Sequence, residues 1–136
     1  MVMKKTVKHI SVFCIVLSLI LLVGCFKYSS KYFGLGLISL NTKSHAALSF
    51  LSFRGSRVYK LKYNGDKEGI LYYSGIIKNG SATIYFDIGD GKNKLFEIND
   101  EVNVESSLTL TESCTIYIII ETDGECNNGS FDFKIE

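Results

Sequence analysis

The residue with the most definite chemistry in this sequence is Cys25, whose thiol follows Leu22, Val23 and Gly24. Gly24 has no side chain to shield its carbonyl, so the bond between Gly24 and Cys25 is open to a protease. A thiol at this position can form a thioether to diacylglycerol before cleavage, and the amino group released by cleavage can take an N-acyl chain. The sequence therefore offers one site for cleavage and covalent lipid.

The residues before Cys25 have the order of a secretory signal peptide. The first nine contain three lysines and no acid, and residues 10–23 are apolar apart from two serines and Cys14. A transmembrane helix is the alternative, but spanning a bilayer takes about 20 apolar residues. The run of 14 is short and ends at Gly24, which favours a signal peptide.

In this setting Leu22-Val23-Gly24-Cys25 resembles the lipobox of bacterial lipoproteins. The resemblance implies cleavage before Cys25, lipid on its sulfur, and a protein anchored on the extracytoplasmic face of the cell membrane. Two acyl chains anchor stably, whereas one binds only marginally. Phe26 follows the cysteine, where Asp would suggest inner-membrane retention.

We divide the chain into a signal peptide (1–24), a lipidated tether (25–44) and one folded domain (45–136). The mature chain has twelve Lys or Arg and fourteen Asp or Glu. A domain of this size buries roughly 65% of its unfolded surface and can fold alone. The tether mixes lysines with aromatic residues, which suits either a membrane interface or a solvated linker. One short strand is expected within it, near residues 37–40.

Short segments of period two, typical of β-strands, run from about His45 to the C-terminus. The clearest predicted strands cover residues 58–63, 82–88, 114–122 and 130–136, and weaker ones residues 46–53, 70–74, 95–98 and 107–111. Within 82–88, the inward set is Ala82, Ile84, Phe86 and Ile88. No segment keeps a helical period over a helical length.

Turn signals separate these segments. Four pairs tolerate the positive φ of a tight turn, namely Asn64-Gly65, Asn79-Gly80, Asp90-Gly91 and Asp123-Gly124. Seven to nine strands at this spacing predict an all-β fold, an antiparallel β-sandwich with some jelly-roll character, preceded by the signal-peptide helix.

Residues 49–136 also resemble small lipoproteins of Gram-positive bacteria. Their shared features are a strand rich in lysine, a middle hairpin of Gly-x-Leu type at residues 69–73, and a closing hairpin formed by residues 117–121 and 129–135. The resemblance implies a β-sandwich carried on a lipid anchor and implies no particular activity.

Cys114 and Cys126 are the cysteines that remain after Cys14 is removed and Cys25 is lipidated. An even number of remaining cysteines in an exported protein favours a disulfide. In the closing hairpin, however, Cys126 would lie in the loop and Cys114 at the far strand end, roughly 26 Å away. A disulfide needs a Cα separation near 5.5 Å, so we expect the two thiols to stay unpaired.

Catalytic and metal-binding patterns are absent from the sequence. His45 has no partner motif, so we interpret it as a strand-end histidine and not as a general base. The stretch from Asp87 to Gly91 has the look of a calcium loop but lacks the alternation of an EF-hand. We interpret it as a plain turn and predict no metal, no cofactor besides the lipid, and no enzymatic activity.

The charges are distributed unevenly along the chain. Seven basic residues and no acid lie between Phe26 and Lys62, whereas twelve acids and three lysines lie between Asn79 and Glu136. A basic run often binds nucleic acid, but an exported protein rarely meets any. The basic half could face anionic lipid or an envelope polymer, or its charges could cancel against the acidic half across the sheets.

Tyrosines give the one weak hint of a ligand face, because aromatic rings stack on apolar faces of sugars and peptides. The candidates are Tyr59, Tyr72, Tyr85 and Tyr117, and the alternative for each is packing within the sheets. The sequence thus favours a lipid-anchored binding protein of the cell envelope without catalysis, its ligand an envelope polymer or a peptide. The alternative is an immunity or resistance lipoprotein that sequesters a cationic membrane-active peptide.

Overall fold

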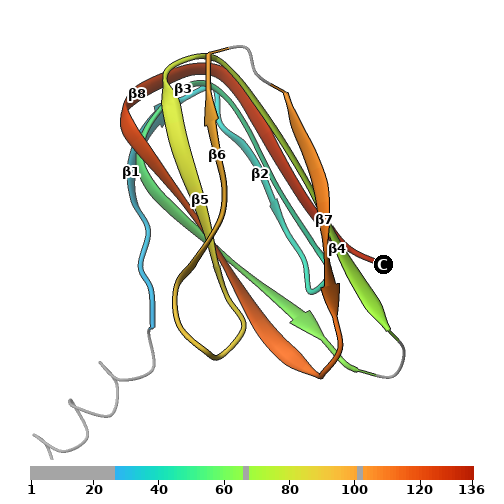
Figure 1. The fold of residues 1–136 in the computed structure, drawn as a ribbon. Coiled ribbons are helices and arrows are strands. Elements are labelled where there is room, and N and C mark those ends of the chain that lie inside the picture. Colours follow the sequence, from blue (N-terminus) through green and yellow to red (C-terminus); the bar gives the residue numbers. More distant parts are fainter. Residues whose placement is uncertain (1–26, 66–67, 101–102) are drawn as a thin grey trace, which may run out of the picture.

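The computed structural model describes residues 27–65, 68–100 and 103–136, and these form an all-β structure (Figure 1). The predicted signal peptide (1–24), with Leu22, Val23 and Gly24, and the predicted lipid site Cys25 lie outside the described residues. The strands are β1 (Lys31–Leu35), β2 (Ile38–Asn41), β3 (His45–Tyr63), β4 (Gly69–Asn79), β5 (Ser81–Asp87), β6 (Asn93–Asn99), β7 (Val104–Leu110) and β8 (Cys114–Ile135).

Two long strands, β3 and β8, organise the fold. They pair antiparallel from His45 opposite Lys134 to Tyr63 opposite Cys114. The pairing shifts register between Arg54 and Ser56, and both strands arch over at this level (Figure 1). Each long strand therefore contributes one half to each of two packed layers.

Layer 1 contains residues 45–54 of β3 and 125–135 of β8. Strands β1 and β2 pair with the edge of β3 that does not pair with β8. On the other side of the layer, β4 pairs with β8, and β7 pairs with β4. Layer 2 contains residues 56–63 of β3 and 114–122 of β8, with β5 beside β8 and β6 at the edge. All these pairings are antiparallel, so the predicted antiparallel β-sandwich of seven to nine strands is confirmed.

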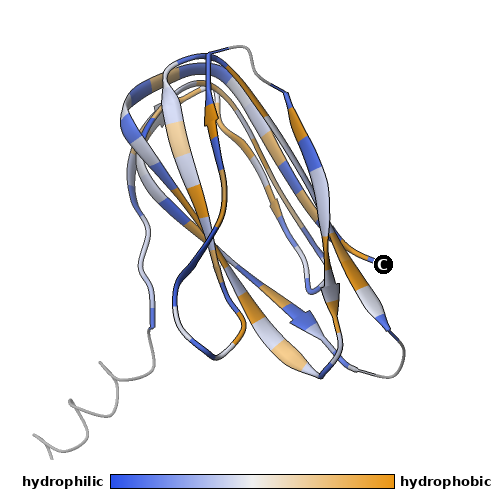
Figure 2. Cartoon of the chain, in the orientation of Figure 1, coloured by the Kyte–Doolittle hydropathy of each residue, from blue (hydrophilic) through white to orange (hydrophobic). Residues whose placement is uncertain are grey.

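The core lies between the two layers and follows from the alternation of the strands, visible as orange and blue bands in Figure 2. Phe96 of layer 2 stacks on Tyr73 of layer 1 at 5.3 Å between ring centroids and also approaches Phe131, at 6.4 Å. The largest fully buried side chains are Tyr59, Phe53, Phe131, Phe133, Leu48, Leu61, Leu71, Ile77, Ile84, Ile116, Ile118 and Ile119. Most of them occupy alternate positions on β3 and β8.

Two sequence-based expectations about chain direction were wrong. The closing hairpin does not exist, because residues 114–135 form the single strand β8, and Asp123-Gly124 lies within this strand. Residues 69–73 do not form a hairpin either, because they lie within the single strand β4. Asn79-Gly80 lies where the chain crosses from β4 to β5, and these two strands each pair with β8 instead of with each other. Glycine with positive φ serves a bend and a crossover between layers as well as it serves a hairpin.

The inward pattern predicted for β5 fails at its end. Ile88 is 36% exposed, whereas Asp87 is fully buried. A register shift between Ile84 and Tyr85 disturbs the pairing of β5 with β6, and other parts of the chain cover Asp87, as described below. The period of two predicted for residues 58–63 is confirmed, with Tyr59, Leu61 and Tyr63 buried. In residues 114–122, Ile116, Ile118 and Ile120 are buried in alternation, but Ile119 on the opposite face is buried as well.

Residues 27–44, which the sequence analysis treats as a tether, contribute β1 and β2 to layer 1. The Arg57 guanidinium lies over the rings of Tyr32 and Tyr59, at 4.8 and 5.2 Å from their centroids. It also donates to Tyr32 Oη and, at 3.2 Å, to Ser39 Oγ. These contacts attach the segment to β3 by side chains as well as by strand pairing.

Candidate functional site

The outer face of layer 1 is hollowed into a groove of about 400 Å³. Strand register places one row of four residues across it, Ile38, Ser49, Ser130 and Ile76. Small hydroxyl side chains form the floor of this row, and an isoleucine stands on each side. Ile38 is 74% and Ile76 42% exposed, and apolar side chains exposed around one hollow are a feature of interaction sites.

The next two rows along the strands become polar. The second row runs from Leu40 across Ala47, Asp132 and Ser74 to Glu105, and the third consists of His45, Lys134, Tyr72 and Ser107. A second hollow of about 270 Å³ lies here and shares Ser74 and Asp132 with the first. We call the two hollows together the layer-1 groove. It is apolar at the Ile38 end and acidic at the end formed by Glu105, Asp132 and Glu136.

His45 lies at the edge of this groove, beside Asp132, which borders both hollows. Its Nε2 lies 2.7 Å from Asp132 Oδ1, and both side chains are partly exposed. A histidine beside a carboxylate is oriented by it, but a general base also needs a nucleophile or substrate within reach. The contact defines a polar corner of the groove.

The four candidate tyrosines do not share a face. Tyr72 is 44% exposed and stands in the layer-1 groove. Tyr59 is buried between the layers, with its hydroxyl 2.7 Å from Ser39 Oγ. Tyr85 and Tyr117 lie on the outer face of layer 2, where Lys92 covers one ring at 4.3 Å and Tyr28 packs edge-on against the other at 5.5 Å.

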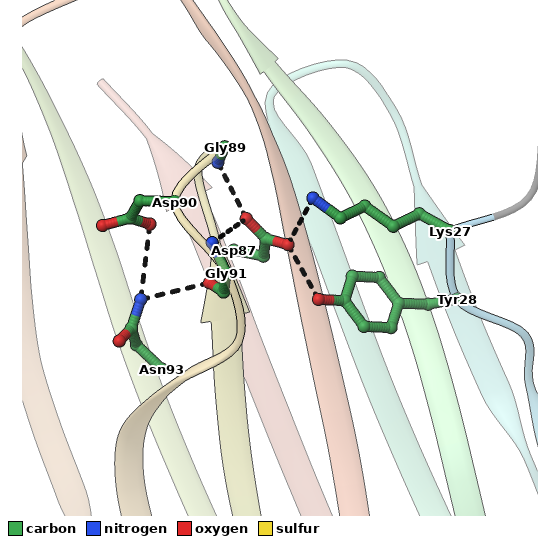
Figure 3. A network of polar contacts seen from close by, with 7 residues as sticks. All are labelled: Lys27, Tyr28, Asp87, Gly89, Asp90, Gly91 and Asn93. Atoms are coloured by element: carbon green, nitrogen blue, oxygen red, sulfur yellow. Dashed lines mark hydrogen bonds and ion pairs between the residues drawn. The ribbon is translucent and has the colours of Figure 1, made fainter.

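A second site lies where the described chain begins (Figure 3). Asp87, at the end of β5, receives Lys27 Nζ at 2.8 Å and Tyr28 Oη at 2.7 Å, both on Oδ2. Its other oxygen accepts the backbone N–H groups of Gly89 and Gly91 at 2.8 and 3.2 Å. The Asp87 side chain is fully buried as a result, whereas that of Lys27 remains 49% exposed.

Hydrogen bonds decide the protonation of this cluster. The pKa of Asp87 lies well below its usual range because of Lys27 and then the N–H and O–H donors around it, although burial alone would raise it. The same contact raises the pKa of Lys27 and of Tyr28. The carboxylate is ionised at neutral pH, and each of its two oxygens accepts hydrogen bonds from two neighbouring groups.

The stretch from Asp87 to Gly91 forms a turn closed by the Asp87 carboxylate. Oδ1 accepts the two glycine N–H groups, and Asp90 accepts from Asn93 Nδ2 at 3.3 Å. No three His, Cys, Asp or Glu side chains come together as a metal site anywhere in residues 27–65, 68–100 and 103–136. Nor does this part of the chain contain a helix able to cross a bilayer.

Both described cysteines are free thiols. Cys126 is fully buried and donates to the Ser81 carbonyl at 3.2 Å, while Cys114 is partly buried near the other end of β8. The two thiols are unpaired, as expected. The reason is not the predicted hairpin, because Cys114 and Cys126 lie at different positions of the single strand β8. Burial raises the pKa of both thiols.

Charges of the basic and acidic halves cancel only in part. Lys27 with Asp87 and His45 with Asp132 join the two halves, while Lys92 with Glu121 pairs residues within the acidic half. Among the described residues, no ion pair within 4.0 Å involves Lys43, Lys60 or Lys62. These lysines leave a basic outer surface on layer 2.

Sequence reasoning missed both sites for the same reason. The floor residues Ser49 and Ser130 are ordinary outward residues until strand register places them beside Ile38 and Ile76. Asp87 is unremarkable until the chain start covers it. The position of Asp87 before a glycine-rich turn was the one available signal, and it did not indicate a partner 60 residues away.

The comparisons with known proteins give only distant structural likenesses. No protein family and no curated protein matches the sequence. The pre-peptidase C-terminal domain of a Bacillus anthracis collagenase is 12% identical, with 71% of this chain and 91% of that one covered at a TM-score of 0.46. The C-terminal CBM6 of a laminarinase from Zobellia galactanivorans is 7% identical, with coverages of 78% and 100% and a TM-score of 0.39. A carbohydrate-binding module of a Cellvibrio mixtus lichenase, in complex with cellotriose, is 13% identical, with coverages of 76% and 89% and a TM-score of 0.37. These likenesses are too distant to assign a ligand or an activity to this chain.

Proposed function

We propose that this protein is a lipid-anchored binding protein of the cell envelope, without catalysis, and that the layer-1 groove is its ligand site. The observation that carries the proposal is the row of Ile38, Ser49, Ser130 and Ile76, which leaves two large apolar side chains exposed around a floor of small ones. Pockets that bind ligands combine such apolar walls with a few polar groups, here Asp132 and Glu105.

The anchor is supported by the lipobox resemblance around Cys25. Its test is metabolic labelling with a fatty-acid analogue, followed by membrane fractionation, of the natural chain and of Cys25→Ala. We expect both the label and the membrane retention to depend on Cys25. We also expect the mass of the intact protein to match a chain that begins at Cys25. Label of equal strength on Cys25→Ala would refute the anchor.

A cationic amphipathic peptide is the ligand class favoured by the groove. Its apolar end offers Ile38, Leu40 and Ile76. Its other end offers three carboxylates and one lysine: Glu105, Asp132 beside His45, and Glu136 paired with Lys134 at 3.0 Å. A peptide with apolar and basic side chains would match both ends. This observation favours the sequestering role over a neutral polymer ligand.

Binding can be tested with the lipidated protein in nanodiscs and a synthetic Lys/Leu peptide, with cellotriose as the neutral probe. We expect Glu105→Gln/Asp132→Asn to weaken peptide binding at least fivefold, and Ser130→Trp to weaken it by filling the groove floor. The control Glu97→Gln/Glu121→Gln removes the same charge from layer 2, and Thr83→Trp adds the same ring there. Equal losses in the groove and control variants would refute the groove as the site, and preferential binding of cellotriose would refute the peptide.

A further inference from the structure

The attachment of the chain start to Asp87 constrains where a lipid anchor can lie. Only one residue separates Lys27 from Cys25. A fully extended chain gains at most about 3.6 Å per residue, so the anchor cysteine can lie no more than about 7 Å from the Lys27 backbone. Any lipid on Cys25 must therefore enter the bilayer close to the Asp87 end of layer 2.

The residues that follow Lys27 are attached to the domain by hydrogen bonds and packing. Tyr28 is held by Asp87 and Tyr117, Ser30 Oγ accepts the Val58 N–H at 2.9 Å, and β1 begins at Lys31. The contacts with Asp87, Tyr117 and Val58 all lie on layer 2. The domain is thus attached directly at the anchor and not through a free linker.

The surface beside this attachment point carries lysines. Two shallow hollows of about 280 and 510 Å³ adjoin there and share Asn41 and Lys60. Their rims carry what we call the lysine face: Lys27, Lys43, Lys60 and Lys62. Lys60 and Lys62 must point outward, because their neighbours Tyr59, Leu61 and Tyr63 are buried in the core.

The acids nearby that the structure describes do not neutralise this face. Asp87 forms an ion pair with Lys27 at 2.8 Å, and Glu121 forms one with Lys92 at 2.6 Å. Glu68 and Glu136 border a hollow that also includes Lys62. Glu136 is paired with Lys134 at 3.0 Å, and no ion pair joins Lys62 to either acid. Within the described part of the chain, Lys43, Lys60 and Lys62 therefore keep their charge available for an external anion.

We propose that the lysine face rests on the anionic headgroups of the membrane that holds the lipid, with Asp87 fixing the domain in this orientation. The inference rests on the proposed anchor at Cys25. Lysines near an anionic bilayer are attracted to its surface potential, and the short reach from Lys27 keeps them there. The layer-1 groove lies on the opposite face of the sandwich and would be turned toward the medium.

A single tryptophan can report this orientation, because the chain has no Trp of its own. Thr115→Trp places a reporter on the outer face of layer 2, opposite Lys62, and Tyr72→Trp places one in the groove of layer 1. Each lipidated protein is reconstituted in phosphatidylglycerol/phosphatidylcholine vesicles that contain headgroup-labelled quencher lipid. We expect quenching at position 115 and little at position 72, with the difference falling in phosphatidylcholine alone and at high salt.

Charge-matched variants test the lysines themselves. Lys43→Gln/Lys60→Gln/Lys62→Gln should abolish the difference between the two reporters, whereas Arg54→Gln/Lys78→Gln/Lys134→Gln removes equal charge from layer 1 and should preserve it. Asp87→Asn should reduce the difference while circular dichroism shows the fold intact. Equal quenching of both reporters in the natural background, or stronger quenching at position 72, would overturn the inference.

The outcomes separate the two proposals. Mass spectrometry that finds no lipid on Cys25 overturns the proposed anchor and this orientation with it. Lipid on Cys25 together with equal quenching overturns the orientation alone and leaves the anchor standing.

Discussion

Gly55 of β3 and Thr122 of β8 are joined by two reciprocal hydrogen bonds at the arch of the sandwich. The Gly55 N–H donates to Thr122 Oγ1 at 2.8 Å, and the Thr122 hydroxyl lies 3.3 Å from the Gly55 carbonyl, to which it donates. Gly55 has a φ of +118°, a conformation that glycine adopts freely and other residues adopt with strain. A threonine side chain thus replaces the strand pairing that the bend interrupts.

We predict that Gly55→Ala destabilises the protein more than Gly89→Ala. Both glycines have nearly the same φ, +118° and +119°, so each substitution carries a backbone strain of roughly 1–3 kcal/mol. A Cβ on Gly55 would also lie 2.2 Å from the Lys31 carbonyl oxygen, whereas one on Gly89 would meet nothing within 4 Å. Overpacking adds about 1–3 kcal/mol at Gly55, which urea unfolding would measure; equal losses would contradict the prediction.

Asp87→Asn should lower the free energy of unfolding by about 1.5–3 kcal/mol at pH 7, the usual range for hydrogen bonds to a charged group. The folded pKa of Asp87 is depressed, so its contribution is present above the unfolded value of about 3.9 and is lost as pH falls toward the folded pKa. Stability of the natural protein should therefore decline below about pH 4.

The matching experiment is chemical unfolding of both proteins from pH 7 down to pH 2. The two stability curves should converge as the pH falls, because protonation removes the same charge that Asn lacks. Asp90→Asn provides the control, since Asp90 lies in the same turn and its one described contact is with the Asn93 amide. Parallel curves for the natural protein and Asp87→Asn would contradict the assigned role.

Tyr59→Phe should cost about 1 kcal/mol of stability and leave ligand binding unchanged. Its buried hydroxyl lies 2.7 Å from Ser39 Oγ and donates to the Ala47 carbonyl at 3.3 Å, and one net hydrogen bond is worth about that much. Tyr72→Phe, on the exposed groove, should leave stability within about 0.5 kcal/mol. Thermal unfolding of the two variants distinguishes a core tyrosine from a surface one.

Native protein should react slowly with iodoacetamide at both described cysteines. Burial raises both thiol pKa values, and the thiolate is the reactive form. Cys126, fully buried, should remain unmodified over times in which Cys114 begins to label. Unfolding in urea without reductant should expose both to complete labelling, and a requirement for reductant would reveal a disulfide that contradicts the structure.

The sequence predicted the fold class because period two is a local property of each strand. Tyr59, Leu61 and Tyr63 on one side of β3, and Ile116, Ile118 and Ile120 on one side of β8, were assigned correctly to the core. Whether two consecutive segments form a hairpin or one continuous strand is decided by distant partners. Asp123-Gly124 has a turn composition, but Gly55 and Ser56 across the sheet hold it within β8.

The two candidate sites could not be predicted from the sequence, and the reason is related. The groove requires Ile38, Ser49 and Ser130 to stand in one row, and a shift of one residue in any pairing would send a side chain to the other face. Burial of Asp87 requires Lys27, which is separated from it by 60 positions and by four intervening strands. Local composition contains no information about either relationship.

The pairing of β3 with β8 also determines when the molecule can fold. His45 and Lys134 are partners near the two ends of the described chain, and both layers contain part of β8. A chain delivered N-terminus first, from a ribosome or through a translocation channel, has no complete layer until the 22 residues of β8 arrive. Pairing over such sequence distances is slow, so the strands before β8 stay without their central partner until β8 has been delivered.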